Sequence, residues 1–326
     1  MNRPAHAPYA TGVKSFSIGL KPLDPADWIE ADGGLGFYLE EKRRLLDTAR
    51  DEVWAAEGDT VSSQQEVRDA LIAHLLAHPS GKWVREGAFI RVLDASAEIA
   101  RVEIPADDPA PLLTAALLVQ EDLCLMRKGD DGWRLAAGSV SFASSWSFKA
   151  RFGQTLDGLH AYVPGYPDRL AQRMARIFDN LHVGKPVWRL NWSLYGDGEL
   201  HHPHGKGPMP FAKAEEGGDE GWLDHLFVRV ERQTLMRMPV SGDILFTAIR
   251  IHVDPLRALS RHPDRAVLAE SLRRQLDALD ADQLAYKGLT QHRENSVKFF
   301  PVFVENSFAP LSRRNGLVKP IAMMLS

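Results

Sequence analysis

His160 is the residue whose type and setting point most directly to chemistry. It lies in an apolar loop, residues 159–166, whose backbone is stiffened by Val163, Pro164 and Gly165. A neutral imidazole that enters an apolar setting suits a metal ligand, above all the axial ligand of a haem. The same features also fit a core or turn histidine whose ring nitrogens bond nearby carbonyl groups. The loop therefore leaves two interpretations, a metal ligand or a structural histidine.

A second cluster of polar residues consists of Arg229, Glu231, Arg232 and Gln233, in a segment with the alternation of a β-strand. Arg232 interrupts the apolar face of that strand, so both faces carry charge and need a pocket or an edge to satisfy it. A carboxylate such as Glu231 can bind an amine cation, and guanidinium groups can anchor a propionate or polarise dioxygen. The alternative is a solvent-facing strand with cross-strand ion pairs.

Two further histidine positions are weaker candidates. The run 201–204 (His-His-Pro-His) has poor spacing for one tetrahedral metal site, because Pro203 stiffens it and adjacent side chains diverge. We expect a solvated loop there. His252 and Arg250 share one face of a later strand, where they form either a second ligand set or part of an exposed surface.

Cys124 is the only cysteine of the chain, which excludes an internal disulfide, a cysteine-ligated iron–sulfur cluster and covalent haem attachment through Cys-x-x-Cys-His. Any haem must then be held non-covalently, and any iron–sulfur relay must come from another polypeptide. Because Cys124 lies in a strand-like apolar run, we expect a buried, inert thiol.

The composition is that of an ordinary soluble globular protein, with 44% hydrophobic and 25% charged residues and a net charge of −4 among 326 residues. This charge gives no case for a nucleic-acid partner. The longest apolar run, residues 112–119, is too short to cross a bilayer, and residues 1–14 lack the apolar core of a signal peptide. We therefore expect a cytoplasmic protein without a membrane partner.

The elements that must position these residues begin with helices. Apolar residues at helical spacing predict one helix over 37–55 and a second from a capping box at 63–66 as far as Pro79. Short β-prone segments follow. Asp168 has the pattern of an N-cap, and its helix stops at Gly184. The β-prone segments are Phe89 to Leu93, Glu98 to Ile104, Leu123 to Met126 and Trp133 to Phe142.

Three longer strands are predicted at 187–195, 226–234 and 243–253, and their short links favour an antiparallel sheet. The connection 196–222 is expected to be a surface loop, and helices at 265–279 and 282–287 are expected to cap the sheet. In the last strand, one continuous and mainly apolar face is expected from Leu245 to Val253, with Arg250 and His252 on the opposite face. The polar faces of the first two strands carry Arg189, Asn191 and Ser193, and Arg229, Glu231 and Gln233.

Together these patterns predict an α+β fold. Residues 1–80 are expected to form a helical N-terminal extension, 81–255 an antiparallel sheet core and 256–326 a helical C-terminal cap, all in one compact unit.

The motifs, taken together, resemble those of the alpha subunit of haem-dependent oxidative N-demethylase and the proteins related to it. The resemblance covers most of the chain, and its two most specific blocks are residues 189–193 and 229–235. The matching segments are Phe16 to Leu23, Asp27-Trp28, Trp146 with Gly153, Leu159-His160, Val163 to Tyr166, Arg189 to Ser193, Arg229 to Leu235 and Met238-Pro239. The sequence departs from the family pattern at Arg151, Tyr162 and His252, where lysine, proline and tyrosine are expected.

The resemblance implies a PAS-like core that holds haem b between its sheet and a helix. It also implies oxidative demethylation of a small secondary amine such as dimethylamine, with dioxygen and with electrons from a separate reductase subunit. FMN, a 2Fe-2S cluster and NADPH are then expected only on partner subunits, and a tetrahydrofolate-binding subunit is a further implied partner.

By position, the resemblance makes His160 the proximal iron ligand. It places Arg229, Glu231 and Gln233 on the distal side, which faces the amine and the oxygen. The further residues expected to contact the cofactor are Arg189, Asn191 and Arg232.

Two other functions remain as alternatives. A PAS-type core can bind haem as a sensor or carrier without turnover, and a non-haem hydrolase could use the loop 201–204. The dense charged cluster around Glu231 favours the enzyme over the sensor, because a simple gas sensor needs fewer ionisable groups.

Overall fold

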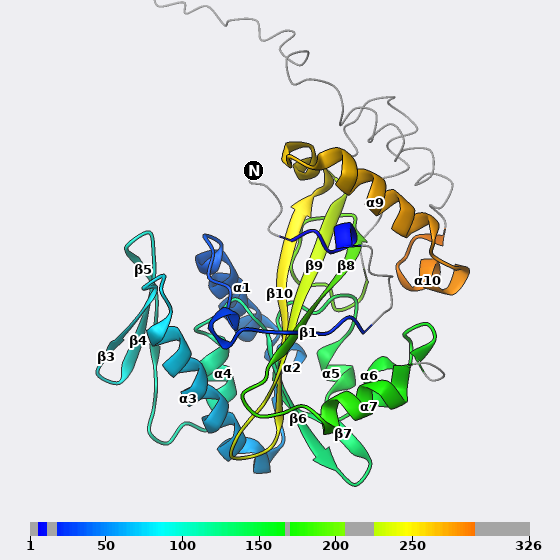
Figure 1. Ribbon diagram of the computed structural model, residues 1–326. Coiled ribbons are helices and arrows are strands. Elements are labelled where there is room, and N and C mark those ends of the chain that lie inside the picture. The colour runs from blue at the N-terminus through cyan, green and yellow to red at the C-terminus, as the bar shows by residue number, and fades with distance from the viewer. Residues whose placement is uncertain (1–5, 12–17, 167–169, 206–224, 291–326) are drawn as a thin grey trace, which may run out of the picture.

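A seven-stranded antiparallel sheet forms the centre of the protein in the computed structural model, which describes residues 6–11, 18–166, 170–205 and 225–290. A separate three-stranded sheet, made of β3 (Trp83–Glu86), β4 (Phe89–Asp94) and β5 (Ala97–Glu103), lies beside it (Figure 1). The strands of the main sheet, in spatial order, are β1 (Lys21–Pro22), β8 (Val187–Tyr195), β9 (Phe227–Arg237), β10 (Ile244–Pro255), β6 (Leu123–Gly129), β7 (Gly132–Ser139) and β2 (Trp54–Ala56).

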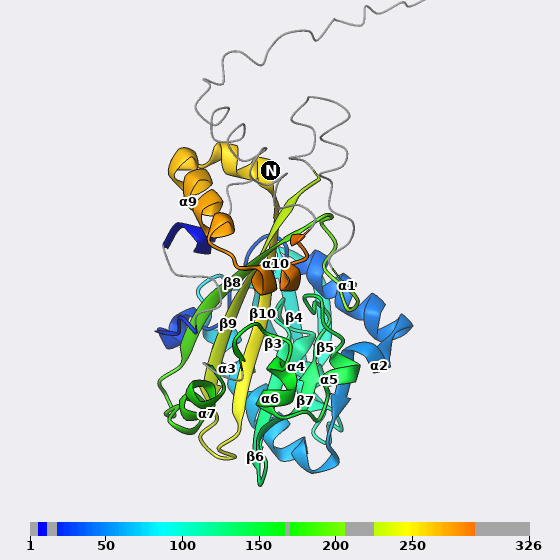
Figure 2. The same ribbon diagram turned by 90° about the vertical axis from the view of Figure 1, so that its right-hand side faces the viewer.

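Helices cover the main sheet on both sides (Figures 1 and 2). On one side, α3 (Val61–Ala77) and α4 (Pro111–Ala116) pack between it and the three-stranded sheet. On the other side lie three short helices, and two more follow the last strand. These are α5 (Phe148–Arg151), α6 (Leu156–His160) and α7 (Ala171–Asp179), then α9 (Arg265–Asp277) and α10 (Ala281–Tyr286).

The alternation of β8 and β9 separates an apolar face from a polar one. Trp192 and Leu194 of β8 pack with Val230 of β9 and with Leu268 of α9 in one buried cluster. The intervening residues of both strands point to the side that carries α5, α6 and α7. The predicted faces of these two strands are therefore confirmed.

The helical start of the chain differs from the prediction in two ways. The helix predicted over 37–55 is divided into α1 (Leu35–Thr48) and α2 (Arg50–Val53), and Trp54 then begins β2. The predicted capping box is wrong, because α3 begins at Val61 and Ser63 lies buried inside it, where its hydroxyl accepts a hydrogen bond from Arg127. The first 80 residues therefore contribute β1 and β2 to the edges of the main sheet as well as helices.

The continuous apolar face predicted for the last strand is also wrong. The pairing of β10 with β9 shifts register between Thr247 and Arg250, so the alternation changes phase there. Leu245 consequently packs on the side of α3 and α4, while Ile251 packs on the side of α5, α6 and α7. Beyond the shift, Arg250 and His252 still share a face, as predicted.

The two helices predicted near the C-terminus are confirmed as α9 and α10, and the mixed helix and antiparallel sheet content confirms the α+β class. The predicted N-cap Asp168, the connection from 206 to 222 and the cap beyond 290 lie outside the described residues. Within the described part of the chain, no helix combines the length and the apolar composition needed to span a membrane.

Candidate functional site

His160 is not in a loop, contrary to the prediction, but is the last residue of α6, and its ring is oriented by the helix itself. Nδ1 lies 2.8 Å from the carbonyl oxygen of Leu156, one turn earlier. A carbonyl oxygen can only accept, so Nδ1 must carry the proton and donate. Nε2 of a neutral ring is then the atom with the lone pair, and it bonds to no other group among the described residues. This is the tautomer that a metal-binding histidine needs.

The neighbours of His160 hold its ring in one plane. The ring of Tyr166 stacks on it, with centroids 5.1 Å apart and an interplanar angle of 15°. Tyr166 is buried, and its hydroxyl donates a 2.9 Å hydrogen bond to Asp157. Arg151 donates a 2.6 Å hydrogen bond to the carbonyl oxygen of Gly158. The loop is therefore preorganised by contacts that do not use the Nε2 atom.

Burial lowers the pKa of His160, and the positive charges of Arg189 and Arg151 lower it further, against the opposing effect of the Leu156 carbonyl. Because the pKa in the folded protein lies below the 6.5 of an ordinary histidine, the neutral form of the ring predominates at pH 6.5. As the pH falls through 6.5, the unfolded chain binds its proton first, so the contribution of this group to stability decreases.

We expect the NMR titration of His160 in haem-free protein to have its midpoint below pH 6.5. The signal is assigned by its absence from a His160→Ala spectrum. A midpoint at or above 6.5 would contradict the burial described here.

Polar side chains of β8 and β9 lie opposite this helix on one face of the main sheet, here called the Glu231 face. Arg189 pairs directly with Gln233 across the strands, and Asn191 pairs with Glu231. The Oε2 atom of Glu231 accepts hydrogen bonds from Asn191 (3.2 Å) and Gln233 (2.9 Å). Its Oε1 atom bonds to no described residue. Glu231 is only 9% exposed, so the sheet presents an oriented carboxylate with one acceptor oxygen still available.

Arg189 connects His160 with the Glu231 face. Its charge lowers the pKa of His160, and the charge of Glu231 opposes the burial that lowers the pKa of Arg189 itself. The Nε atom of Arg189 is buried without a hydrogen-bond partner. A buried N–H group without a partner is costly, so this Nε atom favours an anionic group supplied from outside the polypeptide.

The end of α10 lies over the same face (Figure 2). Burial lowers the pKa of Lys287 to about 8, against the opposing charge of Glu231, and its Nζ donates a 2.8 Å hydrogen bond to the carbonyl oxygen of Trp192. Burial of the hydroxyl raises the pKa of Tyr286, and the charge of Glu231 raises it further, although 48% of this residue is exposed. No pattern in the sequence indicates that either residue lies at the site.

A comparison with known families identifies the family of the chain. The model of the family described as "haem-dependent oxidative N-demethylase, alpha subunit-like" matches residues 19–297. The chain belongs to this family. The description indicates a haem-dependent oxidoreductase, and the words "alpha subunit" imply an assembly of several subunits. The resemblance seen in the sequence is thereby confirmed at the level of the family.

The residues present fit the haem that the family description names. The Nε2 atom of His160 would bind the haem iron, and the unpartnered Nε of Arg189 would suit an anionic propionate. Apolar side chains from the surrounding elements supply the water-poor environment. They are Leu159 of α6, Met174 of α7, Val187 of β8 and Val253 of β10, all packed against the same buried cluster.

Arg229 lies on the Glu231 face, but its guanidinium is occupied by the protein. Its Nε donates to Ser144 (2.8 Å), and its terminal nitrogens donate to the carbonyl oxygens of Phe142 (2.7 Å), Leu200 (2.8 Å) and Glu199 (3.1 Å). The residue is 1% exposed. This family member therefore uses Arg229 to join two loops to the sheet, and few of its N–H groups remain for a ligand.

Arg232 points to the opposite face of the main sheet. It donates to the carbonyl oxygens of Trp28 (3.0 Å) and Asp27, and its Nε lies 3.1 Å from Glu30. The sheet separates it from His160, so it is not part of the candidate site, in contrast to the position that the resemblance suggested.

The histidine run 201–204 is not the solvated loop that we expected. His202 is 7% exposed and forms an isolated β-bridge with Ser144, and His201 Nδ1 lies 2.7 Å from the carbonyl oxygen of Ser141. The run packs on the segment that Arg229 holds. Cys124 is buried, as predicted, and burial raises the pKa of its thiol, which makes it inert.

Proposed function

We propose that this chain binds haem b through the Nε2 atom of His160 and acts in the oxidative N-demethylation of a small secondary amine, with dimethylamine as the reference substrate. The observation that carries the proposal is one sheet face beside a histidine of the metal-binding tautomer, where Arg189 has a buried Nε atom without a partner and Glu231 has an oriented carboxylate.

The strand order supports a PAS-like core within residues 81–255. Along the chain, the strands β6 and β7 are followed by the helices α5, α6 and α7 and then by the strands β8, β9 and β10. In the sheet, β6 pairs with β10. His160 thus comes from the helical segment that packs on the sheet. In this proposal β1 and β2 are additions at the two edges of the core, and the three-stranded sheet precedes the core strands β6 to β10 within the same range.

The roles of the residues follow from their hydrogen bonds. Bound haem supplies the binding and reductive activation of dioxygen. Glu231 holds the ammonium form of the amine through Oε1 and can receive its proton there, while Asn191 and Gln233 keep the carboxylate oriented. Arg189 binds an anionic propionate or stabilises negative charge that develops near the substrate.

Other subunits must supply the electrons, since one buried cysteine cannot hold an iron–sulfur cluster. We propose a reductase subunit with FMN and a 2Fe-2S cluster that oxidises NADPH. The methyl group leaves as formaldehyde, for which a tetrahydrofolate-binding subunit is the proposed acceptor. The proposed location is the cytoplasm.

The Glu231→Gln variant tests the amine site. We expect haem to remain bound, and the affinity for dimethylamine, measured from the shift of the haem absorption, to fall by roughly 30- to 100-fold. The charge-assisted hydrogen bond is lost while the shape of the side chain is kept, a cost of about 2–3 kcal/mol. Glu86→Gln, on the exposed three-stranded sheet, is the matched control and should bind as the wild type does.

Equal amine affinity in Glu231→Gln and in the wild type would exclude Glu231 as the binding carboxylate. If dimethylamine and other small secondary amines leave the spectrum of the wild-type protein unchanged, the alternative of a haem sensor or carrier replaces the enzyme.

A further inference from the structure

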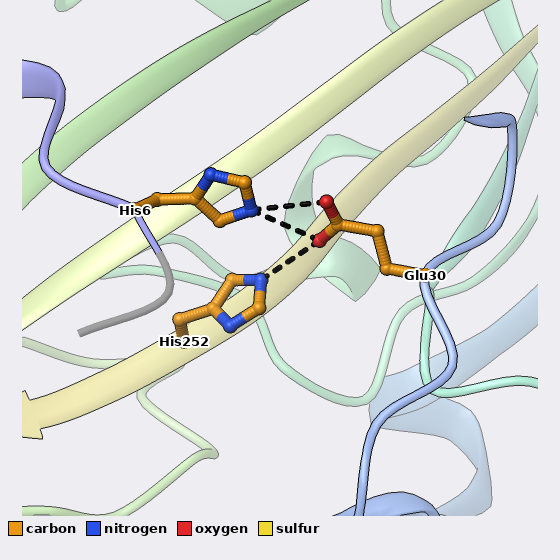
Figure 3. Close-up of side chains that lie close together, drawn as sticks. All are labelled: His6, Glu30 and His252. Atoms are coloured by element: carbon orange, nitrogen blue, oxygen red, sulfur yellow. Dashed lines mark hydrogen bonds and ion pairs between the residues drawn. The ribbon is translucent and has the colours of Figure 1, made fainter. Parts of the chain in front are cut away.

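A second cluster of ligating side chains lies away from the Glu231 face and is not used by the proposed function. It consists of His6, just before the 3-10 helix at Pro8–Thr11, Glu30, in the loop that leads to α1, and His252 of β10 (Figure 3). One potential ligand atom from each residue lies within 4.8 Å of those from the other two. Three segments far apart in the sequence thus converge.

The sheet separates this cluster from the candidate haem site. His252 pairs with Val230 of β9, and its neighbour Ile251 pairs with Glu231. Successive residues of a strand point to opposite faces, so His252 points away from Glu231. The two sites are distinct, and the presence of one does not depend on the other.

The distances within the cluster suit one shared ion. The Nε2 atoms of His6 and His252 each lie 3.1 Å from the same carboxylate oxygen, Oε2 of Glu30. Ligands bound at about 2.0–2.2 Å around one ion are separated by roughly this amount, so little movement is needed to admit it. Both imidazoles present the same nitrogen toward the carboxylate, as Figure 3 shows.

The groups around Glu30 determine which of its oxygens is available. Oε1 lies 3.1 Å from Nε of Arg232 and 3.0 Å from Nε2 of His6, whereas Oε2 is shared by the two histidines alone. The backbone N–H of Glu30 donates a 3.1 Å hydrogen bond to the buried Glu121. Glu30 is therefore fixed from two sides, as the carboxylate ligands of metal sites commonly are.

The surrounding charges tolerate a cation. Arg232 and Arg250 are positive, and Arg250 forms an ion pair with Asp32. Glu30 adds negative charge, as does Asp254, which lies two residues after His252 on β10 and so points to the same face. The three carboxylates outnumber the two guanidinium groups, so a divalent ion meets no excess of positive charge.

We propose that His6, Glu30 and His252 bind one divalent transition-metal ion of the zinc or iron(II) class. Two imidazole nitrogens with one carboxylate oxygen form a ligand set that suits zinc or iron(II). Calcium and magnesium prefer oxygen ligands alone. Three protein ligands leave at least one coordination position for water or a small anion. The ion would join the N-terminal segment to the central sheet.

The test uses tag-free, haem-loaded protein that has been treated with a chelator and then equilibrated with ZnCl₂ and dialysed. We expect elemental analysis to find one zinc per chain in addition to the haem iron, and calorimetry to give one tight zinc site. His6→Ala, which removes a half-buried ligand near the chain start, should weaken zinc binding by about 100-fold or more.

His204→Ala is the matched control, because it removes an exposed histidine from the run 201–204 and should leave zinc binding unchanged. No retained zinc in the wild type would overturn the proposal, as would equal retention in the wild type and in His6→Ala. Loss of zinc in His204→Ala but not in His6→Ala would assign the ion to the run 201–204 instead. The iron content and the Soret band of each sample report the haem site separately.

Discussion

Replacement of His160 by alanine is expected to abolish stable haem binding. Haem b has no covalent attachment here, since the chain lacks the cysteines for one. The Nε2 atom of His160 is the proposed axial ligand, and removing it leaves only apolar contacts and Arg189 to retain the cofactor. We expect haem affinity to fall by at least about 100-fold, so that purified His160→Ala protein has almost no Soret band.

His182→Ala is the control for this experiment, because that histidine is exposed beyond the end of α7 and should leave haem binding unaffected. Circular dichroism establishes that His160→Ala has folded, and added imidazole, which can occupy the vacated space, should restore part of the Soret band. Full haem content with an unchanged spectrum in His160→Ala would remove the ligand assignment.

The sequence predicts those parts of the site that depend on local periodicity. The alternation of β8 places Arg189 and Asn191 on one face, and the alternation of β9 does the same for Glu231 and Gln233. Once the two strands are paired in register, these four side chains must gather. His160 is indicated for a different reason, its apolar and stiffened sequence surroundings, although the structure places it at the end of α6 and not in a loop.

Other features depend on contacts between distant segments, which periodicity does not contain. Lys42 occupies a charged position of α1 and yet is 1% exposed, because its ammonium donates to the carbonyl oxygens of Ala116, Val119 and Glu121. The register shift in β10 reverses the face of Leu245 without any proline or glycine to signal it.

The contrast between Arg229 and Arg232 shows the same limit. Both are buried arginines of one strand, and the sequence predicts a functional role for each. Their actual partners are carbonyl groups of loops 87 and 204 residues away, respectively. Some buried arginines donate hydrogen bonds to backbone carbonyl groups far away in the sequence, and others bind a ligand. The sequence alone does not distinguish the two kinds.

Replacement of Arg229 by methionine is therefore expected to act on stability before it acts on chemistry. The variant leaves the carbonyl oxygens of Phe142 and Leu200 without this donor in buried positions, and removes a partly buried hydrogen bond to Glu199. We expect the free energy of unfolding, measured by urea denaturation, to fall by about 3–5 kcal/mol. Arg229→Lys should recover less than half of this, because one ammonium group cannot reach acceptors on both loops.

Arg134→Met is the matched control, since Arg134 pairs with Glu57 through two hydrogen bonds but is about 29% exposed, and the loss there should be at most about 1 kcal/mol. A structural Arg229 should also leave the dimethylamine affinity of the surviving folded fraction close to that of the wild type. If Arg229→Met instead keeps its stability and loses amine binding or turnover, then Arg229 contacts the substrate or the cofactor, and its hydrogen bonds to the two loops must open when the ligand binds.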